Sequence, residues 1–118
     1  MKTVILIGAN GKMGKAALTG LGKHKVITAG RSQDGCDFQV DITSEESLRK
    51  LFKEVGHFDA VVNTVGVCEY ATFEEMTEAQ WMSTVMSKMM GQINIVRIGQ
   101  EYIADKGSFT LITGILNL

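Results

Sequence analysis

The chain alternates apolar runs typical of buried strands with stretches of helical periodicity. Strands that are separated by helices run parallel and are joined by right-handed crossovers. We therefore predict an α/β fold with a doubly wound parallel sheet in the strand order 3-2-1-4-5, formed by one domain over residues 1–118. The five strand-like runs are "TVILIG" (3–8), "KVITAG" (25–30), "DFQVDI" (37–42), "DAVVNTVG" (59–66) and "SFTLIT" (108–113).

Two helix starts are marked by a hydroxyl residue followed three positions later by Glu or Gln, which is the spacing of a capping box. Thr43 and Glu46 have this spacing before an amphipathic segment, and Thr77 and Gln80 have it before a longer one. The second pattern predicts a long helix over residues 77–104.

The composition excludes several classes of protein. A net charge of −1 gives no basic excess for nucleic acid, and no apolar run is long enough to span a bilayer. The cysteines and histidines lack the spacing of a metal site, so we expect no metal. With 45% hydrophobic residues, we expect a soluble cytoplasmic protein with an ordinary core.

A glycine-rich loop, "GANGKMG", follows the first predicted strand and opens a helix. Gly8 can make a sharp turn, Gly11 allows the backbone to approach a pyrophosphate, and Gly14 allows the helix to pack against the sheet. The alternative is a merely structural turn, since three glycines alone are a weak signal. The residues expected to bind a cofactor here are Gly8, Asn10, Gly11, Lys12, Met13 and Gly14.

The second predicted strand ends in "TAGRS", where an NAD-binding protein would carry an acidic residue for the ribose 2′-hydroxyl. Arg31 can pair with a 2′-phosphate instead, Ser32 can add a hydrogen bond, and Lys12 can reinforce the positive charge. We therefore expect NADP rather than NAD. The alternative is that Arg31 is a solvated surface residue.

The motifs "GANGKMG", "VDIT", "NTVG" and "SFTLITG", in this order and spacing, resemble those of the small short-chain dehydrogenases/reductases. The resemblance covers the family's cofactor-binding half. It implies a Rossmann-like fold and hydride transfer between NADP(H) and a carbonyl or alcohol substrate. By resemblance, Asp41 and Ile42 contact the adenine. The "NTVG" residues Asn63, Thr64, Val65 and Gly66 match a motif beside the adenosine ribose.

The same resemblance assigns two catalytic positions, and both depart from the family pattern. Thr113 stands where the family has its active-site Ser, so a hydroxyl is kept and a methyl is added. Lys88 stands where the family has an Asn that supports a proton relay. A charged Lys donates hydrogen bonds and accepts none, so this relay cannot be copied unchanged.

The stretch "YIADK" is a literal match to the family's Tyr-x-x-x-Lys pair, but it precedes the fifth strand instead of following it. Residues just before a parallel strand lie at the amino edge of the sheet, far from the cofactor. We therefore predict that Tyr102 is a partly buried helix-end residue and that Lys106 is a favourable charge at a helix C-terminus. We expect Gly107 to end that helix.

Two functional classes remain open. The chain is either the cofactor-binding part of an NADP-dependent reductase whose Tyr/Lys helix lies beyond Leu118, or a non-catalytic NADP-binding or sensor module. In both cases we expect residues 1–118 to bind cofactor without turnover, and the sequence does not identify the small-molecule substrate. The Met-rich helix 77–104 predicts either a homodimer or coverage by a further C-terminal part.

Overall fold

The computed structural model describes residues 2–9, 12–31, 35–65 and 74–111, and it contains a parallel sheet in the order β3-β2-β1-β4-β5. This order confirms the predicted doubly wound topology. The strands are β1 (Thr3–Ile7), β2 (Lys25–Gly30), β3 (Phe38–Gln39), β4 (Ala60–Asn63) and β5 (Ser108–Thr110). The helices are α1 (Lys12–Gly20), α2 (Glu45–Val55), α3 (Glu78–Thr84), the π-helical η1 (Val85–Met90) and α4 (Gly91–Gly99).

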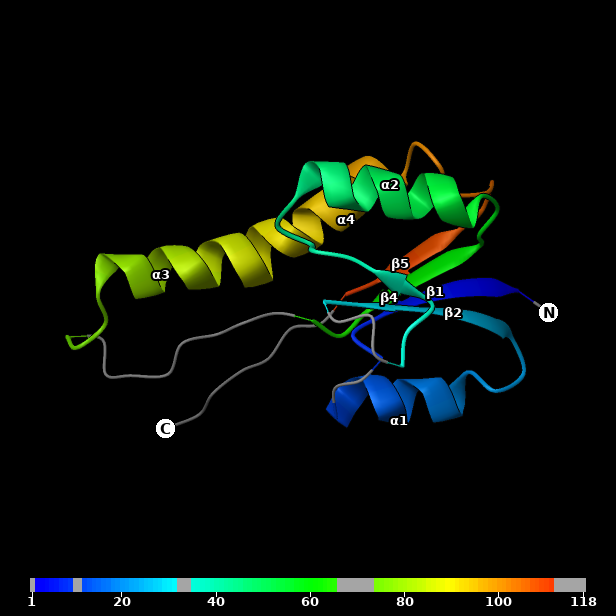
Figure 1. The fold of residues 1–118 in the computed structure, drawn as a ribbon, viewed down its shortest axis with the longest axis horizontal. Coiled ribbons are helices and arrows are strands. Elements are labelled where there is room, and N and C mark those ends of the chain that lie inside the picture. Colours follow the sequence, from blue (N-terminus) through cyan, green and yellow to red (C-terminus); the bar gives the residue numbers. More distant parts are fainter. Residues whose placement is uncertain (1, 10–11, 32–34, 66–73, 112–118) are drawn as a thin grey trace.

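The helices cover the two faces of the sheet unequally. Figure 1 shows α2 and α4 on one face and α1 on the other, while α3 projects past the carboxyl ends of the strands. In the described ranges, no helix is long and apolar enough to cross a lipid bilayer.

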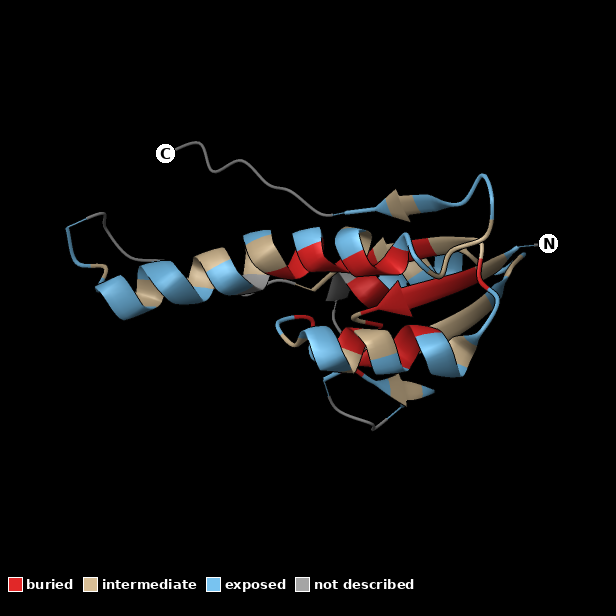
Figure 2. Cartoon of the chain, turned by 90° about the horizontal axis from the view of Figure 1, so that it is seen from above, coloured by how far each residue is buried: buried red, intermediate tan, exposed pale blue. Residues whose placement is uncertain are grey.

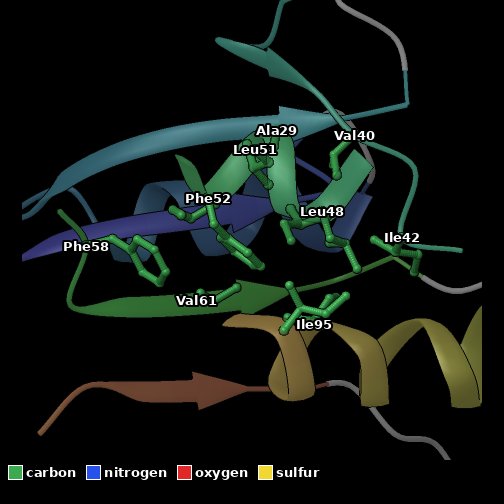
Figure 3. Close-up of a cluster of buried hydrophobic side chains, with 12 residues drawn as sticks. Ala29, Val40, Ile42, Leu48, Leu51, Phe52, Phe58, Val61 and Ile95 are labelled. Carbon is green, nitrogen blue, oxygen red and sulfur yellow. The ribbon is translucent and has the colours of Figure 1, made fainter. Parts of the chain in front are cut away.

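The main core lies between the sheet and the pair α2 and α4 (Figures 2 and 3). The central strand β1 is buried on both faces, and because successive side chains alternate, Ile5 and Ile7 join this core while Val4 and Leu6 face α1. Each fully buried side chain of this size stabilises the fold by about 1.5–3 kcal/mol. The core cluster consists of Ile5, Ile7, Ala29, Val40, Ile42, Leu48, Leu51, Phe52, Phe58, Val61, Ile95 and Ile98.

Two glycines allow α4 to pack closely against its neighbours Ile42 and Phe109. A Cβ atom added to Gly91 would lie 2.7 Å from Ile42 Cδ1, and one added to Gly99 would lie 2.8 Å from Phe109 Cε1. Real Cβ atoms do not come this close to other atoms. A side chain at either position would require Ile42, Phe109 or α4 itself to shift.

The helix expected over residues 77–104 differs in form and in length. The capping box at its start is confirmed, because the Thr77 hydroxyl accepts the Gln80 N–H at 3.2 Å and Gln80 Oε1 accepts the Thr77 N–H at 2.9 Å. The helix then widens into η1, where the Gly91 N–H bonds to the Met86 carbonyl, five residues back. It ends at Gly99, several residues earlier than predicted.

Gly107 and Lys106 therefore do not end this helix, and both expectations were wrong. Residues 100–106 form turns, and Lys106 has a left-handed φ of 65°. Gly107 is required for a different reason, because a Cβ atom there would lie 2.5 Å from Ile103 Cγ1 and 2.7 Å from the Asp59 carbonyl oxygen.

The predicted capping box at Thr43 and Glu46 was also wrong. Ser44 caps α2 instead, and its hydroxyl accepts the Ser47 N–H at 3.2 Å. The Thr43 hydroxyl is already engaged, because it donates to Asp41 Oδ1 at 2.6 Å. The Thr43 hydroxyl therefore bonds to the Asp41 carboxylate and not to the backbone at the start of α2.

β2 has the predicted bounds, whereas β1, β3 and β4 are shorter than predicted, and the last two residues predicted for β5 lie outside the described residues. Around β3, the Asp37 carboxylate accepts the Thr28 N–H at 3.0 Å, and the Ser47 hydroxyl accepts the Asp41 N–H at 2.9 Å. Of the predicted range 37–42, only Phe38 and Gln39 remain in the sheet. The ladder between β4 and β5 ends at Val62 and Thr110.

Asp59 joins three strands at the amino edge of the sheet. Its Oδ2 accepts the Thr3 N–H at 2.9 Å, its own N–H donates to the Thr3 carbonyl at 2.8 Å, and its carbonyl accepts the Ser108 N–H at 3.1 Å. The Thr3 hydrogen bond, together with His57 and Lys2, lowers the pKa of the Asp59 carboxyl. The ionised carboxylate therefore stabilises the folded state.

We expect Asp59→Asn to lower the free energy of unfolding at pH 7, measured by urea denaturation. Because the folded-state pKa of Asp59 is lowered, its contribution is present above the ordinary pKa of 3.8 and is lost as the pH falls through the folded-state value. The difference between the parent and Asp59→Asn should therefore shrink below about pH 4.

The control is Asp105→Asn, which removes an exposed carboxylate from the turn before β5. If the stability difference between Asp59→Asn and the parent does not change with pH, the ionised Asp59 carboxylate is not what stabilises this edge of the sheet.

Candidate cofactor-binding site

The turn after β1 needs glycine at two positions. Gly8 has a left-handed φ of 93°, and a Cβ atom there would lie 2.5 Å from Thr64 Oγ1. A Cβ atom at Gly14 would lie 1.8 Å from the Gly8 carbonyl oxygen. The first turn of α1 is thus packed directly onto the end of β1, as the glycine spacing predicted.

The N-terminus of α1 lies at this turn and is the element expected to face a pyrophosphate. The helix begins at Lys12, and its first turn carries no acidic residue that would neutralise the partial positive charge of the helix end. Several predicted site residues lie outside the described residues, so their roles stay predictions. These are Asn10, Gly11, Ser32, Gly66 and Thr113.

Thr64, directly after β4, hydrogen-bonds to the carboxyl end of β1. Its N–H donates to the Ile7 carbonyl at 3.0 Å, and its hydroxyl contacts the carbonyl oxygens of Ile7 at 3.0 Å and Gly8 at 3.2 Å. The sequence analysis placed Thr64 in a cofactor motif without anticipating these bonds. Its hydroxyl is engaged by the backbone carbonyl oxygens at the start of the glycine turn.

Asn63 shapes the segment that follows β4. The side chain is 2% exposed, its Oδ1 accepts the Val65 N–H at 3.2 Å, and its Nδ2 donates to the Val65 carbonyl at 3.0 Å. Both polar ends of one buried amide therefore hold Val65 in a tight turn. This is a structural role for Asn63, and its predicted contact with the ribose stays a prediction.

A small hollow of about 50 Å³ opens at the carboxyl edge, beside the junction of β1 and β4. Its inner wall is apolar, and the side chains of Arg31 and Asp41 are exposed. Ligands of doubly wound sheets bind outside the carboxyl ends of the strands near this switch point. The residues that line the hollow are Ile7, Gly30, Arg31, Val40, Asp41, Ile42 and Val65.

The rim of the hollow carries one positive and one negative charge. The side-chain and backbone hydrogen bonds from Thr43 lower the pKa of the Asp41 carboxyl, and the nearby Arg31 guanidinium lowers it further. Asp41 is therefore ionised at neutral pH. The described residues contain no group of three or more His, Cys, Asp or Glu side chains that could hold a metal ion.

Lys88 lies in η1 and is half-buried. Its backbone carbonyl accepts Gln92 Nε2 at 3.1 Å, and Gln92 Oε1 in turn accepts Asn63 Nδ2 at 3.2 Å. Gln92 was not among the predicted site residues. The signal in the sequence was a polar residue directly beside Gly91.

The "YIADK" segment lies at the amino edge, as predicted. The Ala104 N–H donates to the Phe58 carbonyl at 3.0 Å, just before β4 begins. Tyr102 is half-buried, stacks on Phe52 with ring centroids 6.0 Å apart, and its hydroxyl lies 3.4 Å from Arg49 Nη1. Tyr102 is thus a packing residue at the amino edge of the sheet, opposite the carboxyl edge where the hollow lies.

The chain is similar in sequence to known reductases. Residues 11–117 match the sequence model described as enoyl-(acyl carrier protein) reductase. A highly reducing polyketide synthase of Fusarium pseudograminearum is 26% identical over 98% of this chain and 5% of the synthase. Acetoacetyl-CoA reductase of Cupriavidus necator is 25% identical over 55% of this chain and 26% of the reductase.

Solved structures share the fold. Protein lin1944 from Listeria innocua is 40% identical, with a TM-score of 0.87 over 92% of this chain and 54% of that protein. A small-chain dehydrogenase solved in complex with NADPH is 24% identical, with a TM-score of 0.79 over 93% of this chain and 49% of its own. The chain therefore spans about half the length of these structures.

The family match covers most of the chain, and the sheet order and the glycine turn agree with it. This protein belongs to the short-chain dehydrogenase/reductase family.

Proposed function

We propose that the chain binds NADP(H) across the carboxyl edge of its sheet and is the cofactor-binding part of an oxidoreductase. That enzyme would transfer a hydride between the nicotinamide and a carbonyl or alcohol substrate. The observation that carries the proposal is the hollow beside the β1–β4 junction, with Arg31 at its rim directly after β2. The glycine turn and the N-terminus of α1 lie at the same edge and provide a place for the pyrophosphate.

We assign one edge of the adenine ring to this hollow. Ile42 and Val65 line it with apolar surface, which the edge of the base would cover. Both bonds from Thr43 end on Asp41 Oδ1. We assign Asp41 Oδ2 to the adenine amino group, a hydrogen-bond donor that an ionised carboxylate can accept.

Arg31 supports NADP over NAD. Its guanidinium is exposed and always charged, so it is available to pair with a 2′-phosphate. One of the structurally similar proteins, a small-chain dehydrogenase, was solved with NADPH bound.

We expect Arg31→Ala to remove most of a preference for NADPH over NADH. A charge-assisted hydrogen bond contributes about 1.5–3 kcal/mol, which corresponds to at least about tenfold in the dissociation constant. Fluorescence titration of both cofactors against the parent and the variant measures this preference.

Lys53→Ala is the matched control, because it removes one positive charge from the exposed last turn of α2. It should leave the ratio of the two dissociation constants unchanged. Equal dissociation constants for NADPH and NADH in the parent would refute the NADP assignment.

The reacting end of the site is assigned to Lys88 and Thr113, the residues at the family's Asn and Ser positions. Neither is the family's proton-donating Tyr, so we propose that residues 1–118 bind cofactor and show no turnover by themselves. Lys88 also favours a second candidate function, a non-catalytic NADP-binding module, because a charged Lys cannot accept the hydrogen bond that the family's relay needs. NADPH oxidation by a longer form of the protein would separate the two functions.

We expect Tyr102→Phe to leave any reductase turnover nearly unchanged, because the Tyr102 hydroxyl lies at the amino edge beside Arg49. A general acid contributes typically 10²- to 10⁴-fold to the rate. Steady-state NADPH oxidation by the parent and the variant provides the comparison. A loss of that size in a folded variant that binds cofactor normally would show that Tyr102 is the proton donor.

A stripe of exposed apolar side chains runs along α3, η1 and α4, formed by Met82, Met86, Met89 and Ile93, which are 42–52% exposed. They recur at intervals of four, three and four residues along this continuous helical segment. Figure 2 shows much of this long helical segment exposed. We propose that this methionine stripe pairs with the same stripe of a second copy.

We expect Met86→Lys to lower the self-association of the chain, measured by sedimentation velocity over a range of concentrations, because it puts a charge into the paired face. Leu18→Lys on α1 is the control, since Leu18 is also exposed, at 39%. If both variants sediment like the parent, the stripe is not the contact between copies.

A further inference from the structure

One polar side chain links the sheet to the π-helical segment through the core. Among the described residues, the buried polar side chains are Asn63, Gln92 and Asn94, at 2%, 9% and 9% exposure. Gln92 Oε1 accepts Asn63 Nδ2 at 3.2 Å, and Gln92 Nε2 donates to the Lys88 carbonyl at 3.1 Å. Both ends of one carboxamide are thus engaged, one at the end of β4 and one in η1.

These two contacts place Gln92 between the two halves of the proposed cofactor site. On one side, Asn63 also holds the turn at Val65, and Val65 lines the hollow. On the other side, Lys88 is the residue assigned to the reacting end. Lys88 lies four residues before Gln92 on the same continuous helix, so that bond is local, and it is the bond to Asn63 that ties this helical turn to the end of β4. A buried hydrogen bond is costly to leave unmade, so loss of the carboxamide frees this turn, and η1 directly before it, from the sheet.

The two halves of the site lie on different sides of the switch point between β1 and β4. Arg31, Asp41 and the hollow follow β2 and β3, whereas η1 belongs to the connection between β4 and β5. A dinucleotide that crosses the switch point with its adenosine in the hollow has its nicotinamide on the η1 side. Lys88 and Gln92 therefore belong to the nicotinamide half.

We propose that Gln92 is a positioning residue that holds η1, and with it Lys88, in the place that the nicotinamide half of the cofactor requires. The proposal rests on the proposed function. Removal of Gln92 weakens the contacts of the nicotinamide half and leaves those of the adenosine half. A purely structural role for Gln92 has a different consequence, because a smaller folded fraction weakens the binding of every ligand by the same factor.

The test compares two ligands on the full chain, NADPH and adenosine 2′,5′-bisphosphate, which contains only the adenosine half with its 2′-phosphate. Gln92→Met keeps the side-chain length and removes both hydrogen bonds. Asn94→Leu is the matched control, because Asn94 is equally buried on the same helix and its Oδ1 accepts Arg97 Nη2 at 3.2 Å instead of a bond from the sheet. Calorimetric titration gives the dissociation constants, and circular dichroism verifies folding.

We expect Gln92→Met to raise the dissociation constant of NADPH by about threefold to tenfold, the effect of one or two hydrogen bonds. The dissociation constant of adenosine 2′,5′-bisphosphate should stay within about twofold, which is a small free-energy change. Asn94→Leu should leave the ratio of the two constants at the parent value. If Gln92→Met does not fold, Gln92→Asn replaces it, since its carboxamide is one methylene too short to reach both partners.

Equal losses for both ligands would overturn the positioning role and leave the proposed function standing. Unchanged NADPH affinity in a folded Gln92 variant would also overturn the positioning role and leave the proposed function standing. A parent chain that binds neither ligand would overturn the proposed function, and the role of Gln92 with it.

Discussion

The carboxyl ends of β1 and β4 are held in contact by Thr64, and the rest of the site is arranged around that contact. The Thr64 hydroxyl lies against the carbonyl oxygens of Ile7 and Gly8, while Gly14 brings α1 to within a distance that no side chain would allow. This junction fixes where the glycine turn, the helix N-terminus and Val65 lie relative to one another. The hollow opens beside the junction because both strands end there.

The connection from β4 to β5 shows how packing reshapes a helix. Gly91 and Gly99 allow α4 to lie close to Ile42 and Phe109, whereas η1 leads away from the sheet into the projecting α3. A π-helical turn shifts the faces of a helix relative to one another, and such turns are frequent at functional sites. Here it contains Lys88, the residue at the position of the family's Asn.

The "YIADK" segment shows why a motif has to be judged by its place in the fold. Tyr102 and Lys106 have the spacing of a catalytic pair, yet the surrounding contacts belong to the seam between α2 and α4. Arg49 pairs with Glu101 at 2.6 Å and with Glu45 at 3.0 Å, and these hydrogen bonds raise the pKa of the Arg49 guanidinium. Tyr102 supports that seam through its ring and its hydroxyl.

The sheet order, the glycine turn and the capping box at Thr77 could be predicted from the sequence. The strand-and-helix alternation limits the connections, Gly8 adopts a backbone that other residues avoid, and Thr77 finds its partner within one helical turn. Arg31 was also correctly placed, since it directly follows a strand whose end could be recognised.

Local spacing left the partners of some groups open. Thr43 had the spacing of a cap for α2, but its hydroxyl bonds to Asp41, two residues away, and Ser44 is the cap. The close approach of Gly99 to Phe109 and the hydrogen bond between Gln92 and Asn63 join residues that are distant in sequence. Sequence patterns give the spacing of candidates, whereas the choice among them follows from contacts that exist only once the sheet and its helices have packed together.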